Sequence, residues 1–223
     1  MSTKQLGENE LREIARQLRQ PEGEGGIRTA EQMQQNNAGM IRSAIDLLAV
    51  QPNESILEIG PGNGSHLNYL LEKAPGIRYT GVDISATMIA EANRLNEQEV
   101  ANGNARFIHS GDPRSIPFPT TSADGIFTVN TLYFWDNPGL YLLELYRCLK
   151  PQGRFSLCFA PASFMKKLPF TVYDFKTYEQ EEVVNLLTEA GFVIQDIYER
   201  NEEVYSGGEM IPRDYLVILS VKQ

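Results

Sequence analysis

The chain has 223 residues, of which 42% are apolar and 22% charged, a composition typical of one globular domain with a sizeable core. Its 29 acidic and 20 basic side chains give a formal net charge of −9, which argues against non-specific binding to nucleic acid or to anionic membranes. The N-terminus lacks the apolar core of a signal peptide and no run of about 18 apolar residues occurs, so we expect a cytoplasmic protein without membrane insertion.

The N-terminal region carries helical patterns and no strand. Apolar residues recur at helical spacing over 11–18, and the sequence PEGEGG at 21–26 interrupts the pattern. A second helix is predicted over 29–50. We therefore expect residues 1–52 to form an N-terminal helical cap or lid and residues 53–223 to form the main domain.

Beyond Pro52, short apolar strands alternate with helical segments. This alternation is typical of an α/β protein whose mainly parallel sheet is covered on both faces. The last two strands are joined by residues 200–213 without a helical pattern, which predicts an antiparallel pair. The predicted strands are 55–59, 78–82, 105–109, 124–129, 153–160, 192–199 and 215–221, and the predicted helices are 64–74, 86–101, 138–149 and 179–190.

The two cysteines, Cys148 and Cys158, lie in apolar segments and have no metal-ligand spacing. We expect two buried, reduced thiols and no metal site.

The segment ILEIGPGNGSHL at 56–67 joins the first predicted strand to the first helix of the sheet. It places Gly60, Gly62 and Gly64 at alternate positions, with Glu58 just upstream. Glycines at the carboxyl end of a strand let the backbone approach a ligand closely, and the next helix offers unpaired N–H groups. A dinucleotide site expects the spacing G-x-G-x-x-G instead, and a carboxylate beside it would repel pyrophosphate. The segment therefore favours a ligand with an ammonium or sulfonium centre.

Polar residues also follow the next three predicted strands. Asp83 ends the second strand, where a carboxylate can accept hydrogen bonds from both hydroxyls of a ribose. Asp112 follows the third strand, where a carboxylate could accept from an adenine amino group, and Asn130 follows the fourth. Because the carboxyl ends of parallel strands meet at one edge of a sheet, we expect these side chains to face one crevice.

Five motifs in this order resemble those of the class I S-adenosylmethionine-dependent methyltransferases, of the small-molecule kind typified by the ubiquinone/menaquinone and sterol C-methyltransferases. LEIGPGNG is similar to the first motif of that family, VDIS to its ribose-binding acid and GDPRSIPF to its adenine-side loop. DGIFTVNTLYFW and LKPQGRF resemble its fourth-strand and fifth-strand motifs. The resemblance covers about residues 53–222. It implies a doubly wound, Rossmann-like, seven-stranded sheet, mostly parallel, whose last strand is antiparallel.

The resemblance also implies that S-adenosylmethionine is the cofactor and S-adenosylhomocysteine the product. It implies in-line methyl transfer to a small-molecule acceptor, mainly through positioning and desolvation, by a monomer or homodimer. Residue by residue, it implies contact with the methionine part for Glu58, Gly60, Pro61, Gly62 and Asn63, with the ribose for Asp83, with the adenine for Ile84, Asp112 and Pro113, and with the amino-acid end or sulfur for Asn130.

The methyl acceptor is expected beside aromatic and methionine side chains, which suit a flat or greasy molecule. Phe134 is assigned to the core, and the segment 160–175 is a second candidate wall. The N-terminal region could be a mobile lid or a fixed helical scaffold. The candidate acceptor-binding residues are Met33, Asn37, Met40, Tyr133 and Trp135.

No general base is assigned, and the two histidines, His66 and His109, are expected to be structural or cofactor-adjacent. One alternative keeps the cofactor but makes the protein a non-catalytic subunit of a methyltransferase complex. Another is a nicotinamide-dependent oxidoreductase, which the glycine spacing and Glu58 disfavour. Nucleic-acid methylation is disfavoured by the acidic charge and by NTLYFW in place of an N/D-P-P-Y/F motif. The acceptor atom (N, O, C or S) stays open.

Overall fold

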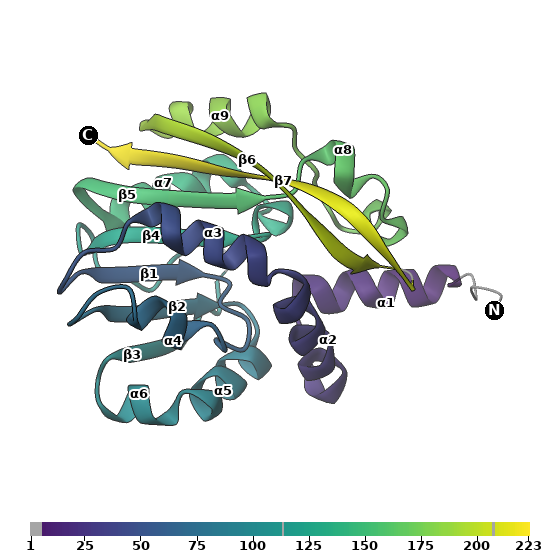
Figure 1. Cartoon of the computed structure of the whole chain (residues 1–223), viewed down its shortest axis with the longest axis horizontal. Helices are drawn as coiled ribbons and strands as arrows, with labels where there is room; N and C mark the ends of the chain where they lie inside the picture. Colours follow the sequence, from purple (N-terminus) through teal and green to yellow (C-terminus); the bar gives the residue numbers. More distant parts are fainter. Residues whose placement is uncertain (1–5, 113, 207) are drawn as a thin grey trace.

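A seven-stranded sheet runs through the protein (Figure 1). The computed structural model describes residues 6–112, 114–206 and 208–223. The strand order is β3-β2-β1-β4-β5-β7-β6, and β7 is antiparallel to both of its neighbours while the other pairs are parallel. The predicted sheet with an antiparallel last strand is confirmed. The strands are β1 (Ser55–Ile59), β2 (Arg78–Asp83), β3 (Ala105–His109), β4 (Ala123–Val129), β5 (Leu149–Phe159), β6 (Phe192–Ser206) and β7 (Glu209–Lys222).

Helices cover both faces of this sheet, with α3, α4 and α5 packed on one face and α7 and α9 on the other. None of the helices within the described ranges has both the length and the apolarity needed to cross a lipid bilayer. The helices are α1 (Glu8–Arg19), α2 (Gly23–Asn36), α3 (Ala38–Leu48), α4 (Leu67–Leu71), α5 (Ala86–Leu95), α6 (Glu97–Ala101), α7 (Pro138–Cys148), α8 (Ala162–Met165) and α9 (Gln180–Glu189), with 3-10 turns η1 (Leu132–Phe134) and η2 (Pro169–Val172).

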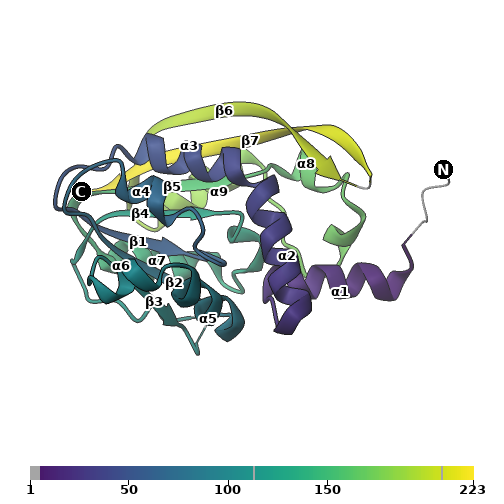
Figure 2. The ribbon, with the colours of Figure 1, turned by 60° about the horizontal axis from the view of Figure 1, so that its bottom comes forward.

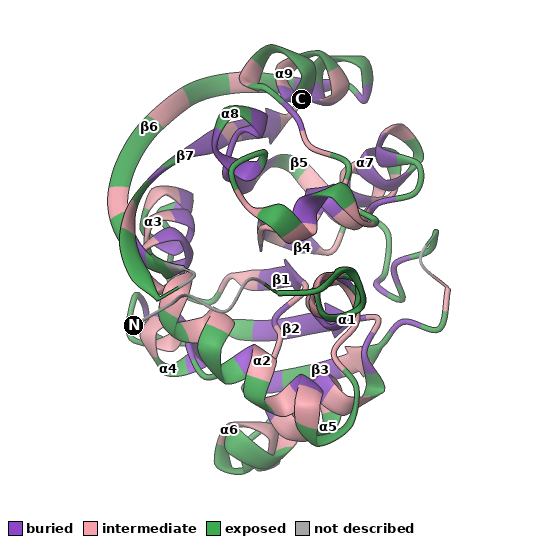
Figure 3. Ribbon diagram, turned by 90° about the vertical axis from the view of Figure 1, so that its right-hand side faces the viewer, coloured by how far each residue is buried: buried purple, intermediate pink, exposed green. Residues whose placement is uncertain are grey.

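Side chains of β1 alternate between two apolar cores. Ile56 packs among residues of α3 and α4, whereas Leu57 and Ile59 pack among residues of α7. Successive side chains of a strand point to opposite faces, so a strand covered on both faces is apolar throughout. Figure 3 shows the buried stretches gathered on the strands between the helical layers. Cys148 and Cys158 are both buried and unbridged, as expected.

The first two helices lie beyond the carboxyl ends of the strands, beside the β6–β7 hairpin (Figure 2). The predicted single helix over 29–50 is wrong, because the chain breaks at Asn37 (φ −98°, ψ 5°) between α2 and α3. The predicted interruption at 21–26 is also misplaced, since its glycines begin α2. Gly26 is needed there because a Cβ would lie 2.6 Å from the Pro21 carbonyl carbon.

Helix α3 belongs to the layer that covers the sheet. Its residues Met40, Ala44, Ile45 and Leu48 are fully buried, and the helix packs against β4 and β5. In α1, by contrast, only Ala15 and Gln17 are buried. The N-terminal region therefore combines one scaffold helix with two helices that cover the end of the sheet.

Other predicted boundaries also differ from the structure. The predicted helix over 64–74 shrinks to α4, and the predicted helix over 86–101 breaks at Asn96. The Asn96 side chain donates to the carbonyls of Gly64 (3.2 Å) and Ala92 (2.9 Å), so it fastens the break to the turn after β1. The last two strands are longer than predicted, at 15 and 14 residues, and extend past the sheet as a two-stranded arm.

Replacing Ile45 by alanine should lower the free energy of unfolding by about 2–5 kcal/mol, because the side chain is fully buried between α3 and the sheet. Arg42→Ala is the matched control on the same helix: Arg42 is exposed and its guanidinium lies 5.3 Å from the centroid of the Tyr69 ring, so its cost should stay below about 1 kcal/mol. Urea denaturation measures both. If both substitutions lower the free energy of unfolding by the same small amount, α3 is not part of the core.

Candidate active site

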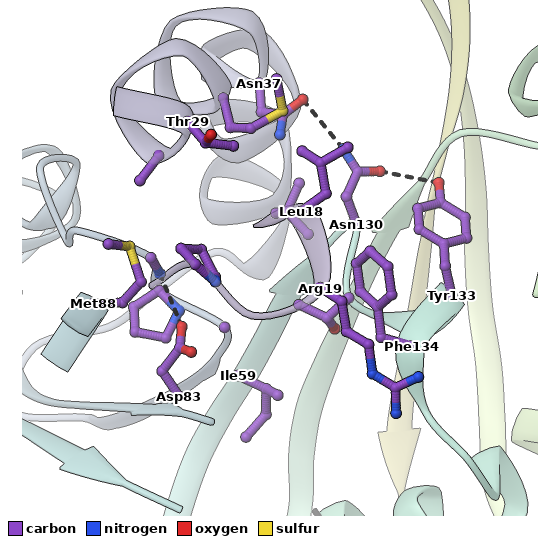
Figure 4. A pocket seen from close by; sticks show the side chains of 18 of the residues that line it. Leu18, Arg19, Thr29, Asn37, Ile59, Asp83, Met88, Asn130, Tyr133 and Phe134 are labelled. Atoms are coloured by element: carbon purple, nitrogen blue, oxygen red, sulfur yellow. Dashed lines mark hydrogen bonds between the residues drawn. The ribbon is translucent and has the colours of Figure 1, made fainter. Parts of the chain in front are cut away.

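A cavity of about 260 Å³ lies at the carboxyl ends of β1, β2 and β4. Strand β1 sits between β2 and β4, and the chain connections leave it in opposite directions. Ligands of open α/β sheets bind at this kind of switch point. Residues of α1 and α2 close the cavity from above (Figure 4).

The turn after β1 forms one wall through bare backbone. Gly60, Gly62 and Gly64 have φ of 73°, 55° and 64°, a region that other residues rarely adopt. A Cβ on Gly60 would collide with Thr131, and one on Gly64 would lie 2.9 Å from the Phe107 ring. A Cβ on Gly62 would meet nothing within 4 Å, so Gly62 borders the open cavity.

Asp83, the last residue of β2, turns its carboxylate toward the glycine turn (Figure 4). It accepts hydrogen bonds from the backbone N–H of Gly62 (3.2 Å) and of Ser85 (2.8 Å). Burial raises the pKa of this carboxyl to about 6, against the two donated hydrogen bonds, which favour the charged form. A ligand that donates further hydrogen bonds to this carboxylate would therefore stabilise its charged form.

Glu58 lies deeper, at 2% exposure, on the face of β1 that carries α4. Its Oε2 accepts hydrogen bonds from His66 Nε2 (2.8 Å) and from the Tyr79 hydroxyl. Burial, with Glu58 alongside, raises the pKa of Tyr79 well above its ordinary value. The acid thus ties the glycine turn to β2, and Glu58 and His66 line the cavity while Tyr79 does not.

The segment between α1 and α2 fastens onto the residues that follow Asp83. Gln20 Nε2 donates to the Ile84 carbonyl (3.1 Å), the Ser85 hydroxyl donates to the Pro21 carbonyl, and Gly23 N–H donates to the Thr87 hydroxyl (3.3 Å). His109 also contacts the end of β2, with its Nε2 3.0 Å from the Ile84 carbonyl oxygen. Residues of α1, α2 and the segment between them form the roof of the cavity. These hydrogen bonds attach the roof to the edge of the cavity that Asp83 and Ile84 form.

Asn130 follows β4 with a left-handed backbone (φ 57°) and reaches up to the roof. Its Nδ2 donates to Asn37 Oδ1 (3.2 Å) and lies 3.3 Å from Met40 Sδ. Its Oδ1 accepts from the Tyr133 hydroxyl (3.0 Å), which in turn accepts from the Ala160 N–H (2.7 Å). Three segments far apart in the sequence thus meet at this amide.

Aromatic rings line the other end of the cavity. Phe134, assigned to the core from the sequence, lines the cavity and stacks edge-on against Phe175, with ring centroids 4.7 Å apart. Phe170 and Tyr133 lie 5.8 and 5.9 Å from the same ring. The two walls expected separately from LYFW and from 160–175 therefore form one apolar surface.

Most of the predicted site residues line this one cavity. Asp112 does not: its carboxylate is exposed and accepts from Arg114 Nε (3.0 Å), whose hydrogen bond lowers the pKa of Asp112. Met40 is fully buried and does not line the cavity, and Pro113 lies outside the described residues. The predicted residues that line the cavity are Glu58, Gly60, Pro61, Gly62, Asn63, Asp83, Ile84, Asn130, Met33, Asn37, Tyr133 and Trp135.

Other lining residues escaped the sequence analysis. Ser110 directly follows β3, where its position after the strand was a usable signal. Arg213 reaches the cavity from β7, and nothing in its local sequence indicates this. The same is true of Gln17 and Arg19 in α1, whose pattern shows only an amphipathic helix.

Comparison with known proteins agrees with this geometry. Residues 57–157, which span β1 to β5, match the family model described as methyltransferase domain. This stretch of the chain is therefore similar to methyltransferase domains. Its fold is similar to the solved S-adenosylmethionine-dependent methyltransferase from Aquifex aeolicus, with a TM-score of 0.66 and 19% identity over 86% of this chain and 97% of that one.

Two curated relatives match the methyltransferase domain in sequence. Over 111 residues the chain is 32% identical to the protein named Putative methyltransferase YrhH of Bacillus subtilis, which covers 50% of this chain and 60% of the relative. Over 117 residues it is 36% identical to the demethylmenaquinone methyltransferase of Thermus thermophilus, which covers 51% of this chain and 50% of that protein. The chain thus matches only half to three fifths of the length of these relatives.

Binding of S-adenosylhomocysteine to the methyltransferase domain should weaken as the pH falls through about 6, because burial raises the pKa of Asp83 to about 6. Only the ionised carboxylate can accept from both ribose hydroxyls, so affinity should fall toward about tenfold per pH unit below that value. Asp83→Asn should bind about ten- to a hundredfold more weakly at neutral pH, since charge-assisted hydrogen bonds contribute about 1.5–3 kcal/mol. Calorimetric titration measures both effects.

Asp112→Asn is the control for this titration, because that carboxylate is exposed and bonded to Arg114. It should leave both the affinity and its pH dependence unchanged. If Asp83→Asn binds S-adenosylhomocysteine as tightly as the wild type does, Asp83 does not hold the ribose.

Proposed function

We propose that this protein transfers the methyl group of S-adenosylmethionine to an apolar small-molecule acceptor. One observation carries the proposal: a single cavity joins the glycine turn and Asp83 at one end to an aromatic wall at the other. Asn130 stands where the two ends meet, bonded to the roof and to Tyr133.

The residues at the turn fit the cofactor. Gly62 presents bare backbone to open space, and the buried Asp83 carboxylate faces the cavity with its pKa raised to about 6. Asp83 would hold the ribose hydroxyls, Ile84 and Met88 would pack on the adenine, and the turn would receive the methionine part. The bound cofactor supplies an electrophilic methyl group on a sulfonium centre.

The chain's own contribution is positioning and exclusion of water. Of the described lining residues, the acids and the histidine (Glu58, Asp83 and His66) all belong to the cofactor end, and Glu58 and His66 are already bonded to each other. The acceptor end offers rings and amides, which orient and desolvate a nucleophile. The relative from Thermus thermophilus is a demethylmenaquinone methyltransferase by name, which supports an apolar acceptor for this chain too.

Truncating the aromatic wall should impair turnover of the acceptor and leave binding of the cofactor unchanged. Phe175 is partly buried, and a bound acceptor would cover it further. Phe175→Ala should therefore lower kcat/KM for the acceptor by about tenfold, since full burial of a phenylalanine side chain contributes about 1.5–3 kcal/mol. The affinity for S-adenosylhomocysteine should change less than about twofold. Val172→Ala, from the same segment but 76% exposed, is the control and should change neither quantity.

The acceptor itself can be found with methyl-labelled S-adenosylmethionine and extracts of small metabolites. We expect label in an apolar compound that mass spectrometry can identify, and no label with Asp83→Asn at the same cofactor concentration. Label in nucleic acid or protein would contradict the proposal. Tight cofactor binding without labelled product from any extract would favour the non-catalytic alternative, and binding of nicotinamide dinucleotides instead would favour an oxidoreductase.

A further inference from the structure

Asn37, at the break between α2 and α3, is held in one orientation by two donors. Its Oδ1 accepts a hydrogen bond from Arg213 Nη1 (2.9 Å) and one from Asn130 Nδ2 (3.2 Å). A guanidinium group only donates, so the amide atom that faces Arg213 must be the oxygen. The nitrogen of the amide, with its two hydrogens, therefore faces away from Arg213.

That nitrogen has no acceptor among the described residues, although Asn37 lines the cavity. The neighbouring amide of Asn130 already has partners within the protein: its Nδ2 serves Asn37 and Met40. Its Oδ1 faces the Tyr133 hydroxyl (3.0 Å), whose one hydrogen can also go to the Ala160 carbonyl (2.9 Å). Figure 4 shows Asn37 reaching from the roof toward Asn130. The free donor thus stands above the junction between the cofactor end and the acceptor end.

The arm of β6 and β7 keeps Asn37 oriented. Arg213, 6% exposed, pairs with Glu202 across the two strands and also donates through Nη2 to the Asn36 carbonyl (2.7 Å). A Cβ on Gly39 would collide with the Glu202 carboxylate, so the glycine lets the arm come this close. A buried ion pair contributes little net stability, whereas it fixes geometry well when all its hydrogen bonds are made. Here the pair fixes the orientation of the Asn37 amide.

Apolar side chains also line the cavity near this donor. Met33 and Ile41, whose backbones bond that of Asn37, and Phe134 are among them. A donor that loses water on ligand binding without gaining a partner costs about 1–3 kcal/mol, so such a site discriminates strongly between ligands with and without an acceptor atom.

We propose that Asn37 Nδ2 donates a hydrogen bond to an oxygen of the methyl acceptor. The acceptor is then an apolar ring or chain that carries a carbonyl, phenol or carboxylate oxygen close to the methylated position. Asn37 acts as a specificity-determining residue, and Arg213 acts through it as a positioning residue. The inference rests on the proposed function, since it names the class of molecule that occupies the acceptor end.

The test compares ketones with hydrocarbons of the same size on full-length protein saturated with S-adenosylhomocysteine. Three pairs serve: 1-tetralone with tetralin, 1-indanone with indane, and acetophenone with ethylbenzene. Trp135, the single tryptophan of the chain, lines the cavity, so its fluorescence reports binding. Each ketone should bind about five- to a hundredfold more tightly than its hydrocarbon.

Asn37→Asp is the decisive variant, because it keeps the oxygen that faces Arg213 and Asn130 and removes the donor. It should abolish the preference for ketones while the affinity for S-adenosylhomocysteine changes less than about twofold. Asn36→Asp is the matched control, since that side chain bonds the Tyr205 carbonyl on the surface (3.3 Å), and it should keep the preference. Circular dichroism checks that both variants fold. The comparison of ketones with hydrocarbons on the wild type does not depend on either variant.

Equal affinity for ketone and hydrocarbon, or no binding of any ketone to the cofactor-loaded protein, would overturn the inference and leave the proposed function standing. A preference that survives in Asn37→Asp would assign the donor to another residue and overturn it as well. If the wild type fails to bind S-adenosylhomocysteine at all, the proposed function itself falls, and this inference falls with it.

Discussion

The parallel pairing of β1 with β2 on one side and β4 on the other determines where the cavity lies. Gly60 N–H donates to the Val82 carbonyl (2.9 Å), and the Thr128 hydroxyl donates to the Ile59 carbonyl (2.8 Å), so the end of β1 is held between both neighbours. With the strand ends fixed at this spacing, the turn that follows has no room for a side chain at Gly60 or Gly64. Gly62, by contrast, borders open space, and the buried Asp83 lies beside it.

The sheet was predictable because its signals are local. Each strand shows a short apolar run, and the polar residue after each run marks the carboxyl end, so Asp83 and Asn130 were placed in one crevice from sequence alone. Asp112 also follows a strand, but its exposed carboxylate does not line the cavity. Its side chain instead accepts hydrogen bonds from Arg114, two residues away.

The helix boundaries of the N-terminal region were not predictable because they depend on contacts between distant segments. The break at Asn37 is stabilised by Arg213 from β7, and the start of α2 depends on how closely Gly26 can approach Pro21. Glu58 shows the converse problem. An acid inside an apolar strand was interpreted as a ligand contact, whereas its two bonds to His66 and Tyr79 also satisfy a buried carboxylate within the protein. Sequence reasoning has no access to partners of this kind.

Helix α2 is attached at both ends, and the two attachments serve different halves of the cavity. Its first residue and the segment before it bond to residues that follow Asp83, on the cofactor side. At its other end, Asn36 and Asn37 bond to Arg213 and Asn130, on the acceptor side. A helix of 14 residues is about 21 Å long. One helix therefore spans both halves of the cavity, and its two attachments tie its position to both of them.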